Sequence, residues 1–150
     1  MILLIRNRQR ARRIDSRLLR QIVIYLLRDL LEKKEFELGI HLIGAKEMAR
    51  VNQQFLQHEG STDVITFDYT EERTFHGEIF ISVDDAISQS KTFRTSWQSE
   101  LVRYIVHGVL HLEGHDDTRT TARRKMKREE NRLLDRLAAQ FSFAKLEKRR

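Results

Sequence analysis

The segment "ELVRYIVHGVLHLEG" (100–114) constrains the fold of this chain more than any other stretch of its sequence. Placed on an α-helix at about 100° per residue, its aliphatic residues cover most of the helix circumference. A helix that is apolar on nearly every side is buried, so other elements must surround it. One narrow stripe is different, because Glu100, Arg103, Tyr104, His107, His111 and Gly114 fall within about 100° of one another.

Two histidines of this stripe, His107 and His111, have the spacing of metal ligands. Residues four apart lie one above the other on a helix, so the two imidazole rings can converge on one ion. If the helix continued, His115 would lie ~12 Å along the axis from His107, too far to share that ion. Gly114 permits the chain to turn back, after which either His115 or Asp117 closes the site.

The rest of the chain predicts one α+β domain over residues 1–150, with a small mixed sheet of about four strands packed against several helices. Alternating apolar residues favour strands over 2–7, 36–44, 62–69 and 75–82. Helical spacing favours a helix that Asp15 or Ser16 caps, the buried helix that ends near Gly114, and helices over 45–56, 83–91 and 120–141.

Three finer expectations accompany these elements. The helix over 45–56 should point Met48, Val51 and Phe55 inward. Thr95 and Gln98 are spaced as a capping box for the buried helix. The segment "HEGS" (58–61) should form a turn.

Cysteine is absent from the sequence, so any metal must be held by His, Asp or Glu. The same absence favours a cytoplasmic protein, where disulfides are rare. No apolar run approaches the ~20 residues that a membrane-spanning helix needs, so we expect no membrane partner.

Both ends of the chain are basic and its middle is acidic. Residues 1–20 hold seven basic residues and one acidic residue, and residues 117–150 hold twelve basic and five acidic residues. Residues 21–116 hold nine basic and sixteen acidic residues. Basic ends favour a polyanionic partner such as RNA, although arginine and lysine also serve simply to solvate helix faces.

Several motifs together resemble one known family. "HGVLHLEGHDD" (107–117) resembles the H-G-x-L-H-L-x-G-x-D-H signature of the YbeY family, zinc-dependent endoribonucleases of ribosomal RNA maturation. "STDVITF" (61–67) and "GEIFIS" (77–82) resemble two strands of that family. "MARVNQQFL" (48–56) and "MKREENRLL" (126–134) resemble two of its helices, so the resemblance covers about 46–134. It implies a four-stranded sheet under several helices.

The resemblance also implies a ligand set of His107, His111 and Asp117 for one zinc ion per chain. Asp117 stands where the family has its third histidine, and Leu56 stands where the family has an arginine associated with catalysis. Nearby His58 is a possible substitute for that arginine. No catalytic residue follows from the sequence. Three residues near the histidines in sequence are considered as a general base: Glu113, His115 and Asp116.

The function that the resemblance implies is a single-strand-acting metallo-endoribonuclease in ribosomal RNA maturation and ribosome quality control. Its partners would be ribosomal RNA and ribosomal particles. One alternative is a non-catalytic, zinc-containing ribosome-assembly factor. A second is a zinc protease, which needs a glutamate immediately after the first histidine, where this chain has Gly108. The remaining histidines, His41, His58 and His76, favour surface or satisfied-core roles.

Overall fold

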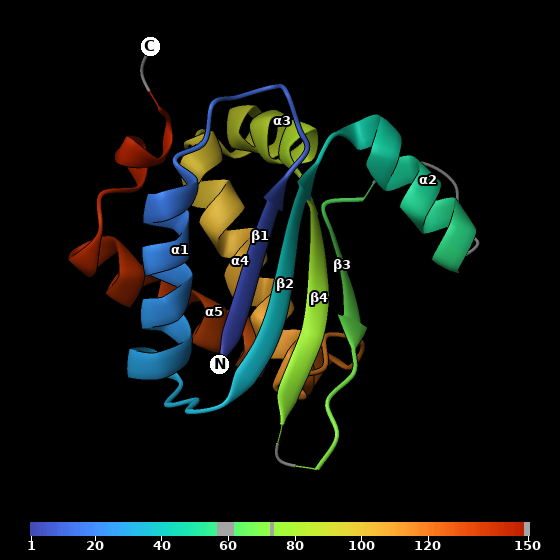
Figure 1. Ribbon diagram of the computed structural model, residues 1–150, viewed down its shortest axis with the longest axis vertical. Helices are drawn as coiled ribbons and strands as arrows, with labels where there is room; N and C mark the ends of the chain where they lie inside the picture. Colours follow the sequence, from blue (N-terminus) through green and yellow to red (C-terminus); the bar gives the residue numbers. More distant parts are fainter. Residues whose placement is uncertain (57–61, 73, 149–150) are drawn as a thin grey trace.

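Four strands form one mixed sheet in the order β1-β2-β4-β3 (Figure 1). The structure is a computed structural model, and it describes residues 1–56, 62–72 and 74–148. Strands β1, β2 and β4 run parallel, and β3 pairs with β4 in the antiparallel sense at the edge of the sheet. The strand bounds are β1 Ile2–Asn7, β2 Phe36–Ile43, β3 Val64–Asp68 and β4 Phe75–Ser82.

Helices connect the strands and then follow them. In the described residues the helix bounds are α1 Ser16–Ile24, α2 Ala45–Leu56, α3 Val83–Phe93, α4 Trp97–Leu112 and α5 Thr120–Gln140. A π-helical turn, η1 (Tyr25–Leu30), extends α1, and a short 3₁₀ helix, η2 (Phe143–Leu146), follows α5. The predicted single α+β domain with a small mixed sheet is confirmed. Within the described residues, no helix is both long and apolar enough to cross a membrane.

The two faces of the sheet are covered unequally, because side chains alternate along each strand. One face packs against α1 and α4 through the main core, to which β2 contributes Leu38, Ile40 and Leu42. Helix α2 covers part of the other face through a small second cluster of Ile43, Met48, Val51 and Ile65. The chain therefore places α4 between the sheet and the helices α3 and α5, as the all-round apolar pattern predicts.

Two glycines let α4 approach the sheet closely. A Cβ atom added at Gly108 of α4 would lie 2.9 Å from the Ile79 side chain of β4. A Cβ added at Gly77 of β4 would lie 2.7 Å from both the Leu112 side chain and the Phe67 carbonyl oxygen. Position 108 therefore faces the core, and only a hydrogen atom fits there without movement of a neighbour.

Two expectations were wrong in detail. Phe55 is 58% exposed: its ring meets only the edge strand, edge-to-face on Phe67 of β3 with centroids 5.6 Å apart, and the buried residues of α2 are Met48, Val51 and Asn52. The N-cap of α4 is Ser96, one residue after the predicted capping position. Its hydroxyl oxygen accepts from Ser99 N at 3.0 Å, while the Thr95 hydroxyl donates to Glu100 Oε1 at 2.7 Å. The "HEGS" turn lies outside the described residues.

Replacing Gly108 by alanine should lower the free energy of unfolding by about 1–3 kcal/mol, because Ile79 must move to admit the methyl group. The intrinsic preference of a helix for alanine acts in the opposite direction, so any loss reports the packing clash. Urea denaturation gives the measurement. Gly39→Ala is the control, because its added Cβ meets Glu78 Cγ at an ordinary 3.4 Å. Equal stability of the two variants would contradict the packing argument.

Candidate metal centre

Helix α4 holds His107 and His111 on the only side of the helix that is not packed into the core. Twelve of its sixteen residues are buried, the two imidazoles are half-buried, and His107 lines a cleft. The ring centroids lie 4.7 Å apart with the rings nearly perpendicular. The two rings therefore converge, as the sequence predicts.

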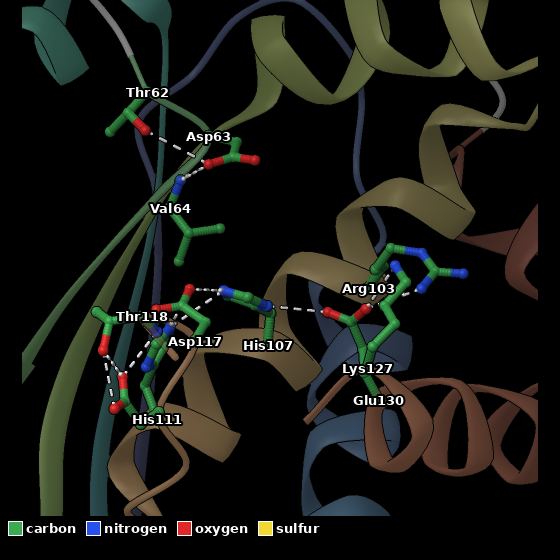
Figure 2. A network of polar contacts seen from close by, with 11 residues as sticks. Thr62, Asp63, Val64, Arg103, His107, His111, Asp117, Thr118, Lys127 and Glu130 are labelled. Atoms are coloured by element: carbon green, nitrogen blue, oxygen red, sulfur yellow. Dashed lines mark hydrogen bonds and ion pairs between the residues drawn. The ribbon is translucent and has the colours of Figure 1, made fainter. Parts of the chain in front are cut away.

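The chain reverses after α4 through Gly114, whose φ is +99°. Gly114 N donates to the His111 carbonyl oxygen at 3.0 Å, and His115 N donates to the Leu110 carbonyl oxygen at 3.0 Å. These two bonds satisfy the last carbonyls of the helix and fix the direction of the turn. The turn returns the Asp117 carboxylate to the two histidines (Figure 2). His115 is not part of this group.

Three side-chain atoms meet at distances that suit one metal ion. His107 Nε2 lies 3.1 Å from His111 Nε2 and 3.7 Å from Asp117 Oδ2, and His111 Nε2 lies 3.3 Å from the same oxygen. Bonds of about 2.0–2.1 Å to a tetrahedral zinc ion place neighbouring ligand atoms about 3.3 Å apart. In the described residues, His107, His111 and Asp117 are the group of three that could hold a metal ion.

A buried carboxylate on α5 orients the first imidazole. His107 Nδ1 lies 3.0 Å from Glu130 Oε1, and Glu130 is only 3% exposed. Burial alone would raise the pKa of Glu130, but hydrogen bonds from His107 and Lys127 outweigh that effect and lower the pKa to about 2. The ionised carboxylate accepts only, so Nδ1 is the donor, and Nε2 of His107 is left to face His111 and Asp117.

The other contacts of Glu130 complete its environment (Figure 2). Its Oε2 accepts from the Arg103 guanidinium and from Lys127 Nζ, each at 3.0 Å. The hydrogen bond to Glu130 raises the pKa of His107, against the opposing effect of burial on the imidazolium. The pair is therefore an ionised carboxylate hydrogen-bonded to the His107 imidazole, with two cations on its other oxygen.

Glu130 is absent from the site that the sequence predicts. It lies in a highly charged helix, 23 residues after His107, where a glutamate is normally solvated. A signal was nevertheless present, since Glu130 follows Met126 by four residues and precedes Leu133 by three. It therefore shares the buried face of α5, and a lone carboxylate on a buried face requires a partner.

The cleft beside the histidines has a volume of about 390 Å³. One wall is the polar stripe of α4 and the opposite wall is α5, which contributes Arg123 and Lys127. Val64 at the edge of the sheet and Phe93 at the end of α3 add apolar surface. The full set of lining residues is Asp63, Val64, Gln89, Phe93, Glu100, Arg103, Tyr104, His107, Asp117, Arg123, Met126, Lys127 and Glu130.

The residues considered as a general base are placed elsewhere. Glu113 pairs with Lys33 at 2.7 Å, and Asp116 accepts from Thr118 N at 2.8 Å and from the Thr118 hydroxyl at 2.7 Å. Neither of these carboxylates lines the cleft, and nor does His115. No general base follows from their positions.

The remaining histidines have local partners. His41 stacks on Phe80 with ring centroids 4.2 Å apart, and its Nε2 lies 3.0 Å from Glu78 Oε1. His76 Nε2 lies 3.6 Å from Glu37 Oε2. His58 lies outside the described residues.

Leu56 stands at the family's arginine position and ends α2, where it is 42% exposed. It does not line the cleft in the described part of the chain.

The lowered pKa of Glu130 predicts an acid sensitivity of the metal-free protein. The ionised carboxylate contributes its full stability above its ordinary pKa of 4.5 and loses it as the pH falls through about 2. Between about pH 5 and pH 2, urea unfolding of the chelator-treated protein should therefore show a loss on the order of 2–3 kcal/mol that Glu130→Gln does not show.

Glu129→Gln is the matched control, because Glu129 is the neighbouring carboxylate and is paired only with exposed Arg132. It should keep most of the wild-type dependence on pH. A Glu130→Gln profile parallel to that of the wild type would show that the pair with His107 does not stabilise the fold.

Known proteins with similar sequences fall into one family. The family model described as "Endoribonuclease YbeY" matches residues 4–138. An endoribonuclease YbeY of Parabacteroides distasonis is 41% identical over 102 residues, which are 68% of this chain and 72% of that protein. One of Bacteroides fragilis is 39% identical over 103 residues, which are 69% of this chain and 74% of that protein.

The fold also has a relative among solved structures. The solution structure of TM1509 from Thermotoga maritima matches with a TM-score of 0.72 and 22% sequence identity, over 99% of this chain and 97% of that one. This likeness supports the α+β architecture. The matches in sequence go further, and they show that this chain belongs to the endoribonuclease YbeY family.

Proposed function

We propose that this chain is a zinc-dependent endoribonuclease, with the domain spanning residues 1–150 and with ribosomal RNA and ribosomal particles as its partners. The observation that carries the proposal is the meeting of His107, His111 and Asp117 at ligand distances, beside a cleft that His107, Asp117 and basic residues line. RNA is the substrate class in the name of the relatives. Ribosomal RNA, ribosome quality control and a cytoplasmic location follow from the family resemblance.

Zinc suits this donor set. Two imidazole nitrogens and one carboxylate oxygen are ligands that zinc accepts, and three protein ligands leave one position for substrate or water. The side chains of His107, His111 and Asp117 are 33%, 27% and 41% exposed, so the site opens to the cleft rather than closing around the ion. A bound zinc ion supplies a Lewis acid toward a phosphate oxygen and lowers the pKa of a water molecule.

The chain's own residues prepare this site in three ways. Glu130 holds the Nδ1 proton of His107, so its Nε2 lone pair is directed at the metal position. Asp117 adds a negative charge beside the two neutral imidazoles. Arg123 and Lys127 line the cleft on α5, where they suit the phosphates that flank a scissile bond.

The size of the cleft favours single-stranded RNA. A concave site of about 390 Å³ suits a small group such as one splayed nucleotide, whereas a duplex holds its bases stacked and paired. Phe93, which is 63% exposed at the edge of the cleft, offers a surface for such a base.

Two alternatives make different predictions. A purely structural zinc in an assembly factor would favour a closed site with four protein ligands, which the exposure of the three side chains argues against. A zinc protease requires a carboxylate directly after the first histidine, and position 108 points at Ile79 in the core. Leu56 in place of the family's arginine is the feature that best supports the assembly factor.

The ligand set predicts an asymmetric response to substitution. Asp117→Ala should abolish tight zinc binding, while His115→Ala should leave about one zinc per chain, because only Asp117 meets the histidines. Asp117→His should keep the metal, because it restores the family's usual ligand. Metal analysis after dialysis against a weak chelator gives the measurement. Zinc retained by the double variant His107→Ala, His111→Ala would contradict the proposed site.

Activity separates the three functions. The purified protein should cleave single-stranded RNA, and a chelator should stop the reaction until zinc is added back. Casein should remain intact under the same conditions. His107→Ala should lose at least about 100-fold in cleavage rate, as is typical when an orienting or metal group is removed. An unchanged rate in that variant, or intact RNA with a zinc-loaded wild type, would overturn the endoribonuclease proposal.

A further inference from the structure

A second cavity, of about 730 Å³, lies between the loop that joins β1 to α1 and the last described residues of the chain. Figure 1 shows the C-terminal segment lying beside the start of α1. The lining residues, which we call the basic cup, are Asn7, Gln9, Arg10, Ala11, Arg12, Arg13, Ile14, Glu147 and Lys148. The basic cup shares no residue with the cleft of the metal centre.

The loop side of the basic cup is held in shape by a buried amide. Gln9 is 8% exposed. Its Nε2 donates to Asn7 Oδ1 at 2.9 Å and to the Arg12 carbonyl oxygen at 2.7 Å, and its Oε1 accepts from Arg12 N at 3.0 Å. Two of these bonds hold the Arg12 backbone and the third holds the Asn7 side chain, so the loop presents its arginines with little further loss of entropy on binding.

The C-terminal segment closes the other side. Asp15 N donates to the Leu146 carbonyl oxygen, and Lys148 N donates to the Arg13 carbonyl oxygen, each at 2.8 Å. Ile14 and Glu147 form an antiparallel bridge between these two bonds. Leu146 is fully buried in the core, so Lys148 is held at the cup by a fixed anchor.

The charge of the basic cup is largely uncompensated. Four cationic side chains and one carboxylate line it. The neighbouring Arg8 is neutralised by Glu47 at 2.5 Å, whereas the side chains of Arg10 and Arg13 have no partner among the described residues. Both are exposed. No aromatic residue lines the cup, so its chemistry is that of arginine and lysine toward anions.

We propose that the basic cup is a second RNA-binding site, which holds backbone phosphates of the strand whose scissile part lies in the cleft. Guanidinium groups pair with phosphate oxygens in a bidentate manner, and contacts of this kind carry no base preference. The proposal rests on RNA being the substrate of the cleft. The proposal adds that an RNA bound for cleavage extends well beyond the phosphodiester bond that is cleaved.

The test compares two double variants with the same change in charge. Arg10→Gln with Arg13→Gln removes the two unpaired cations of the cup, and Arg12 is kept because its guanidinium donates to the Ala11 carbonyl oxygen. Arg28→Gln with Lys34→Gln is the control, because both residues are exposed and line neither cavity. Arg28 lies in η1, at the end of α1 farther from the cup, and Lys34 follows η1.

Binding of a fluorescein-labelled 30-nucleotide single-stranded RNA to the full chain is followed by anisotropy at several salt concentrations. The cup variant should bind on the order of 10-fold more weakly at 0.1 M salt, and its log–log salt slope should fall by about 1.4, the value for two phosphates on a single strand. The control should change the slope by less than half as much.

Glu147→Gln provides a test in the opposite direction. It removes the only carboxylate among the cup residues, so the 30-nucleotide RNA should bind more tightly than it does to the wild type. Equal salt slopes for cup and control variants would overturn the proposal, as would tighter binding of anionic phospholipid vesicles than of RNA. A protein that binds RNA with these slopes but never cleaves it would contradict the proposed function and leave the cup in place.

Discussion

The burial of α4 is the constraint on which the rest of the molecule depends. A helix with apolar residues on nearly every side must be enclosed, and the sheet, α3 and α5 enclose it. Gly108 and Gly77 set how near it lies to β4. Because the other sides of the helix are packed, His107 and His111 have one fixed direction, toward Asp117 at the edge of the cleft. The core therefore determines the orientation of the site.

A buried charge links this core to the chemistry. Glu130 is nearly inaccessible, and it is ionised because His107, Arg103 and Lys127 all donate to it. Such a group is costly to bury and strongly destabilising to leave unpaired. Its role here is to select one tautomer of His107, which leaves the Nε2 atom free to bind a metal. Helix α5 thus supports the site through Glu130, although Glu130 lies outside the sequence motif that contains the two histidines.

Much of the fold and the pair of histidines could be predicted because the signals are local. Helical spacing predicted α4, and alternation predicted β2 and β4. Gly114 predicted the reversal, but which of Asp117 and His115 returns to the histidines depends on the path of the turn, which periodicity does not contain. Asp117 came from the family pattern, and its role as a metal ligand stays a prediction. Phe55 was misplaced because the helical pattern does not show that its neighbour in the sheet is the edge strand β3, where Phe67 covers only part of its ring. Glu130 was missed because its partner is on another helix.

The donor set has a consequence for oxidative conditions. Metal sites built on thiolates lose their ion when peroxide converts the sulfur to sulfenic or sulfinic acid. The atoms that meet here are imidazole nitrogens and a carboxylate oxygen, and the sequence contains no cysteine at all. Among the described residues, Met126 is the sulfur-bearing side chain that lines the cleft, and it is 2% exposed. A metal held by these three side chains would remain bound in conditions that empty a cysteine site.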